Sequence, residues 1–170
     1  MTLDPKKRDG LRPVDAGYLA KIDEHGWAVM KVAPRVGDDG DYFAYSTGLF
    51  RKFGQPEILI FGLELDLMHQ MINIVGKQMM RSGVHFEANH GYSDILDRYD
   101  CQFRVVHKTQ FRDYLGFSIW FYEGLDFPAL QCFWPDREGY FPWQDGYSPG
   151  LRKLQPFLFL SKSDSTNAVQ

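Results

Sequence analysis

Three hydroxyl-bearing residues, Tyr45, Ser46 and Thr47, stand side by side in the segment FAYSTGLF, directly before Gly48. The aromatic and small polar residues of this segment predict a strand that ends at the glycine. Hydroxyl groups at a strand end can hold a phosphate or a carbonyl group, because each one both donates and accepts hydrogen bonds. The alternative is that Ser46 and Thr47 satisfy backbone groups of the turn. No G-x-S-x-G motif occurs, which argues against a serine hydrolase.

A carboxylate, Glu57, follows Pro56 at the start of the apolar run EILIFGL. Such a run predicts a strand that is buried on both faces. A buried carboxylate needs partners, because removing an unpaired charge from water is costly. We therefore expect Glu57 to accept backbone N–H groups of the turn, and a role as a general base is the alternative.

The five histidines do not show the spacing of a metal site. His85 and His90 flank Glu87 at a separation of five residues, whereas a helical zinc site places its histidines four residues apart. We therefore predict no metal. Dinucleotide and P-loop motifs are also absent, so the cofactor stays open, and a flavin mononucleotide held by a small antiparallel barrel is one alternative.

Aromatic residues crowd into WPDREGYFPWQDGY, residues 134–147, where prolines and glycines exclude a regular helix. We expect most of these rings to fold back as a lid over one sheet face, and Asp136 to bond its own turn. The inner edge of the lid would border a pocket shared with other strand ends. The predicted binding residues are Tyr45, Thr47, Glu57, Trp134, Asp136 and Trp143.

Composition limits the function classes. The 170 residues suffice for one domain, and 16% of them are aromatic. A net charge of −3 without a basic stripe argues against nucleic acid as a partner. No apolar run reaches the roughly 18 residues of a membrane span, and no secretory signal is visible, so we predict a cytoplasmic protein that does not enter membranes. Two cysteines make no disulfide framework.

The pattern of elements predicts a single α+β domain at residues 16–160, between a flexible arm at 1–15 and a disordered tail at 161–170. Strands are expected at 27–34, 42–50, 57–63, 101–108 and 128–135, and helices at 66–82 and 109–124. The resulting β-β-β-α-β-α-β order favours a mostly antiparallel sheet packed by two helices, followed by the long aromatic loop.

The clearest element is the helix at 66–82, whose apolar side chains recur every three or four residues: Met68, Met71, Ile72, Val75 and Met79. Asp66 is the expected N-cap and Gly83 the expected C-cap. Gly76, in the middle, costs about 1 kcal/mol relative to alanine, so we expect another backbone to approach closely there.

The motifs HGWAVMKV, YFAYSTGL, QPEILIFGL and LQCFWPDREGYFPWQDGY, in this order, resemble the bacterial family called domain of unknown function 4262. The resemblance covers roughly residues 20–158. Ser46 and Thr47 stand where a single threonine of a YTxGL pattern is expected. The resemblance implies a bacterial single-domain protein and carries no activity, substrate or catalytic residue with it.

We therefore expect a small binding or interaction domain whose aromatic-lined cleft takes a small molecule or a segment of a protein partner. One alternative is a small enzyme that uses a flavin or a nucleotide, with Glu57, His85 or His90, and Asp136 as acid–base groups. Another alternative is an immunity-type or accessory protein that acts by protein–protein contact. A monomer and a homodimer are both compatible with the composition.

Overall fold

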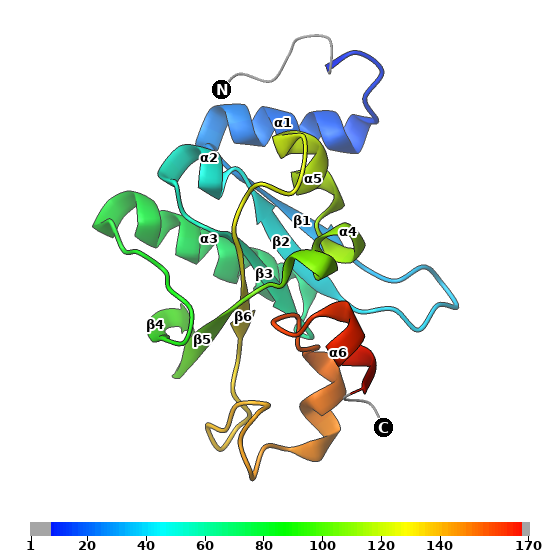
Figure 1. The fold of residues 1–170 in the computed structure, drawn as a ribbon. Helices are drawn as coiled ribbons and strands as arrows, with labels where there is room; N and C mark the ends of the chain where they lie inside the picture. Colours follow the sequence, from blue (N-terminus) through cyan, green and yellow to red (C-terminus); the bar gives the residue numbers. More distant parts are fainter. Residues whose placement is uncertain (1–7, 168–170) are drawn as a thin grey trace.

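A six-stranded mixed sheet forms the centre of the molecule. The computed structural model describes residues 8–167 (Figure 1). The strands are β1 (Ala28–Val32), β2 (Phe43–Thr47), β3 (Glu57–Phe61), β4 (Gly91–Leu96), β5 (Tyr99–Val105) and β6 (Ala129–Phe133). They lie in the order β1-β2-β3-β6-β5-β4, and only the β3–β6 pair is parallel. The predicted α+β class with a mostly antiparallel sheet is confirmed.

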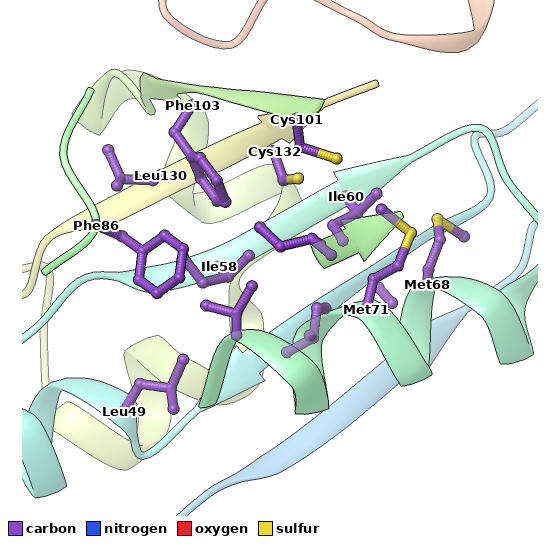
Figure 2. Close-up of a cluster of buried hydrophobic side chains, with 14 of the residues drawn as sticks. Leu49, Ile58, Ile60, Met68, Met71, Phe86, Cys101, Phe103, Leu130 and Cys132 are labelled. Carbon is purple, nitrogen blue, oxygen red and sulfur yellow. The ribbon is translucent and has the colours of Figure 1, made fainter. Parts of the chain in front are cut away.

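The three central strands β2, β3 and β6 are buried along their whole length, because helices cover both faces of the sheet. On one face lies helix α3 (Leu65–Ser82), which packs its methionines against Ile58, Ile60 and the two free cysteines (Figure 2). The other face is covered by α1 (Pro13–His25), α4 (Phe111–Tyr114) and α5 (Gly116–Tyr122) (Figure 1). The apolar run EILIFGL is thus explained by burial on both sides.

Helix α3 confirms the predicted face of Met68, Met71, Ile72, Val75 and Met79, and Gly83 ends it in the left-handed region. The N-cap is Glu64 rather than Asp66, which instead pairs with Lys31 at 2.9 Å. A Cβ at Gly76 would lie 2.6 Å from the ring of Trp27. The expected close approach is therefore real, but an indole ring makes it and not a backbone.

Several elements differ from the sequence-based expectation. Strand β4 forms an irregular hairpin with β5 where no element was predicted, and helix α2 (Leu49–Phe53) occupies the end of the second predicted strand. The helix expected at 109–124 is divided into the 3₁₀ turn η2 (Lys108–Gln110), α4 and α5, since the backbone leaves helical geometry at Leu115.

Both chain ends carry more structure than expected. Helix α1 begins at Pro13, inside the predicted arm, where Arg12 pairs with Asp15 at 2.7 Å. Helix α6 (Lys162–Asn167) occupies most of the predicted disordered tail and is joined to α4 by the pair Lys162–Asp113. It follows the 3₁₀ helix η3 (Pro149–Leu154). Residues 1–7 of the predicted arm and 168–170 of the predicted tail lie outside the described residues.

Candidate functional site

The strand register separates the predicted binding residues into two groups. Glu57 opens β3 opposite Ala129, the first residue of the parallel strand β6. Trp134 follows the last residue of β6, and its indole N–H donates to the carbonyl of Phe61 at 2.7 Å. The two groups therefore lie at opposite ends of the sheet, and the expectation that one pocket borders both of them is wrong.

The first group surrounds the carboxylate of Glu57, which is fully buried. It accepts hydrogen bonds from the Ser46 hydroxyl at 2.5 Å, from the N–H groups of Gly48 and Phe50 at 2.8 and 3.2 Å, and from the Tyr122 hydroxyl. Desolvation raises the pKa of Glu57, and these donors partly oppose that rise. The prediction that Glu57 accepts turn N–H groups is confirmed, and its acceptor sites are used within the protein.

The neighbouring hydroxyls are also used internally. Thr47 Oγ1 lies 2.6 Å from the Ser118 hydroxyl, and both side chains are buried. The Tyr45 hydroxyl accepts the N–H of Phe117 at 3.1 Å, and desolvation raises the pKa of Tyr45 to about 12. These contacts support the interpretation that Tyr45 and Thr47 stabilise the fold. Sequence reasoning missed Ser118 and Tyr122, because no local signal links them to strand ends more than 60 residues away.

The second group holds the aromatic loop in place. The carboxylate of Asp136 accepts backbone N–H groups, including those of Ser148, Tyr140 and Glu138 at 2.9 to 3.0 Å. Desolvation raises the pKa of Asp136, but these donors lower it by more, so the pKa lies below its usual value. Asp136 thus bonds its own turn, as predicted. Phe141 and Tyr147 are buried while Tyr140 is 42% exposed, so most of the rings fold back as expected.

Trp143 is half-buried and contacts a residue that the sequence did not single out. Its ring stacks on Phe141 and meets Phe133 edge-on. The guanidinium of Arg104 on β5 lies 4.2 Å from the Trp143 ring centre and 5.3 Å from that of Phe159. The buried Nε of Arg104 has no hydrogen-bond partner among the described residues. Arg104 therefore joins the loop to the C-terminal segment by cation–π contacts.

A pocket of about 510 Å³ lies between α4, the aromatic loop and the C-terminal segment. Its walls include Pro142 of the loop, Tyr114 of α4, and Phe157 and Leu160 of the C-terminal segment. Its volume lies within the usual range of small-molecule sites. Desolvation raises the pKa of Tyr114, and its hydroxyl has no hydrogen-bond partner among residues 8–167. Of the predicted loop residues, none lines this pocket, but their loop supplies part of its wall.

A second pocket, of about 840 Å³, lies at the other end of the sheet. It is lined by Phe50, Phe86, Phe111 and Phe127 and opens beside Val105, whose side chain is 56% exposed. Glu57 does not line it. The Nζ of Lys108, on its rim, donates to the carbonyl oxygens of Leu125 and Phe127. This pocket is therefore mainly apolar, and the ammonium group of Lys108 on its rim already has hydrogen-bond partners within the protein.

The model of the family described as domain of unknown function (DUF4262) matches residues 21–148. The chain belongs to this family. The DUF4262 match begins within α1 and ends just after the aromatic loop, so the resemblance seen in the sequence is confirmed, with a shorter C-terminal extent. No curated protein and no solved structure matches the chain.

Within residues 8–167, no group of three or more His, Cys, Asp or Glu side chains is placed to hold a metal ion. None of the helices in that range is long and apolar enough to cross a membrane.

Proposed function

We propose that the protein binds a small molecule in the pocket of about 510 Å³ beneath the aromatic loop. One observation carries this proposal: the pocket combines apolar walls with polar groups that the protein does not satisfy. Known small-molecule sites have this composition, in which apolar surface provides affinity and a few polar groups orient the ligand. The hydroxyl of Tyr114 is such a group.

The Glu57 cluster is a weaker candidate for binding. Its carboxylate already accepts hydrogen bonds from Ser46, Tyr122 and the turn backbone. A ligand would have to displace these internal donors, whereas nothing internal has to leave the pocket at Tyr114. The aromatic loop fits the same proposal, because its rings fix Pro142 as part of the pocket wall.

Native mass spectrometry of gently purified protein tests the proposal. We expect a retained small-molecule mass, and we expect Leu160→Trp to remove it, because the larger side chain fills the pocket. Leu67→Trp, at a position that is 36% exposed on α3, is the matched control and keeps the mass. A clean apo mass, together with no small-molecule binding in a fragment screen of the folded protein, would contradict the proposal.

A second candidate function, contact with a partner protein, is favoured by the open edge of β5. Val106 donates to Ala129 on β6 at 2.9 Å, so the N–H and C=O of the preceding Val105 point away from β6. The pairing with β4 stops at Gln102. An extended partner segment could pair with Val105 and place a side chain in the 840 Å³ pocket. This function would be supported if the protein forms a complex with the product of a neighbouring gene and Val105→Pro abolishes that complex.

A further inference from the structure

We infer that the ligand of the 510 Å³ pocket has an apolar body and an anionic head group, held by Arg152 and Lys153. This inference rests on the proposed function, since it names the class of ligand for the same site. Both side chains line the pocket and both belong to η3. A carboxylate and a phosphate share the required chemistry, since both accept charge-assisted hydrogen bonds from these cations.

The two cations have no acidic partner of their own. Neither forms an ion pair among the described residues, although six other pairs occur there. The chain as a whole carries a net charge of −3, so two adjacent unpaired cations on a pocket rim do not follow from a generally basic surface. The rim is therefore a local positive region that favours an anion.

The remaining walls define the body of the ligand. Pro142, Pro156, Phe157 and Leu160 present apolar surface, and Phe157 stacks on Phe159 at a centroid distance of 5.0 Å, which keeps its ring in place. Burying hydrocarbon or an aromatic ring against them contributes roughly 25 cal/mol per Å² of apolar area. An anion without an apolar body would leave this surface exposed.

Acidic groups near the pocket do not cancel the cations. Desolvation, together with repulsion from the nearby carboxylates of Asp41 and Asp113, raises the pKa of the Tyr114 hydroxyl. Asp113 is paired with Lys162 at 2.7 Å, and desolvation raises the pKa of Asp41. Neither carboxylate lines the pocket. Tyr114 therefore stays neutral and can donate a hydrogen bond to the ligand.

Most of the pocket is built by residues that follow the family match. Arg152, Lys153 and the segment from Gln155 to Leu160 all lie beyond residue 148. The residues that give the preference for an anion therefore lie outside the part of the chain that the family model matches.

Four probes with one phenylpropyl body test the inference: 3-phenylpropanoate, 3-phenylpropyl phosphate, 3-phenylpropanol and 3-phenylpropylammonium. Their dissociation constants are measured by calorimetry on the full-length protein. We expect at least one anionic probe to bind about tenfold more tightly than the alcohol, the range of one charge-assisted hydrogen bond, and the ammonium probe to bind most weakly. The tighter of the two anionic probes then distinguishes a carboxylate ligand from a phosphate ligand.

The double variant Arg152→Gln, Lys153→Gln should bind the anions no better than the alcohol. Lys77→Gln, Arg137→Gln changes the net charge equally at exposed positions outside the pocket and should keep the tenfold preference. Equal binding of the alcohol and both anions by the unmodified protein would overturn the inference and leave the proposed function standing. Failure of all four probes to bind would also overturn the inference, and the apo mass and the fragment screen would then decide the proposed function separately.

Discussion

At the scale of single residues, the polar side chains at the start of β3 act as structural anchors. Ser46 shows this most directly, because its hydroxyl donates to Glu57 and accepts the N–H of Ile58 at 2.9 Å. The two strand ends and α5 are thereby joined through one buried carboxylate. Removing one partner of such a network leaves the others unsatisfied, which costs more than the average hydrogen bond.

The first prediction concerns Glu57→Gln and pH. The pKa of Glu57 in the folded protein lies above its usual value of 4.5, so the folded state holds this proton more tightly than the unfolded state does. The contribution of Glu57 to the free energy of unfolding is therefore full below pH 4.5 and is lost as the pH rises through the folded-state pKa. The glutamine variant lacks this dependence.

Urea unfolding of both proteins between about pH 4 and about pH 8 measures the effect. At the acidic end, where Glu57 is protonated, we expect Glu57→Gln to cost about 1 kcal/mol or less, because the amide, like the protonated carboxyl group, offers one acceptor oxygen and a hydrogen-bond donor. The cost should shrink with rising pH, whereas exposed Glu138→Gln should show no such trend. A cost that grows with pH would mean that the donors hold the pKa of Glu57 below its usual value.

The second prediction concerns Gly76, where the sequence indicated a close approach but not that the Trp27 ring makes it. A Cβ there would meet the Trp27 ring, which is buried and bonded through its N–H to Asn73 at 3.0 Å. We expect Gly76→Ala to lower the free energy of unfolding by about 1–3 kcal/mol, since the ring must move. Gly17→Ala in α1, where a Cβ meets nothing within 4 Å, should instead stabilise by about 0.5–1 kcal/mol in chemical denaturation. Equal effects would exclude the steric explanation.

At the scale of elements, the periodicity of apolar side chains correctly predicted which residues of a helix and a strand are buried. The face of α3 and the burial of β3 follow from side-chain spacing alone. Strand β4 was not predicted because it is irregular. Asp94 has a positive φ, and the register of the pairing with β5 shifts between Tyr92 and Leu96. Helix α6 escaped because its sequence is polar and its attachment depends on a distant partner, Asp113. Local irregularity therefore explains the first difference, and a long-range contact that local patterns do not encode explains the second.

The candidate site shows the same limit. Asp136 could be assigned to its own turn because its partners are close in sequence. The separation of Glu57 from Trp134 could not be foreseen, because it depends on β6 inserting parallel to β3. Arg104 carried no signal either, since its partners Trp143 and Phe159 lie on two later segments.

The third prediction tests the attachment of the aromatic loop. If Arg104 holds Trp143 by a cation–π contact, a double-mutant cycle of Arg104→Met and Trp143→Ala should give a coupling energy of about 0.5–2 kcal/mol in chemical denaturation. Trp143→Ala alone should cost about 1–3 kcal/mol, because a half-buried indole loses its packing. Arg98→Met, on the exposed hairpin, serves as the control and should not couple to Trp143. Zero coupling for Arg104 would show that the loop is held by ring packing alone.

At the scale of the whole molecule, the sheet keeps two polar clusters apart. Glu57 and the carbonyl of Phe61 that binds Trp134 lie at opposite ends of β3, four residues apart, which is about 13 Å along a strand. The strand between them is fully buried and apolar, so no chain of hydrogen bonds connects the clusters along it. The Glu57 end can therefore maintain the fold while the opposite end borders the 510 Å³ pocket.

The fourth prediction follows from this separation. Asp136→Asn should cost about 1 kcal/mol, since an amide accepts fewer of the backbone N–H groups that the carboxylate now binds. Because Asp136 and Glu57 share no partner, the cost in the double variant with Glu57→Gln should equal the sum of the single costs within about 0.5 kcal/mol. Urea denaturation at one pH measures all four proteins. A larger deviation would mean that the buried centre of the sheet transmits strain between its ends, and the pocket beneath the aromatic loop would then respond to changes at Glu57.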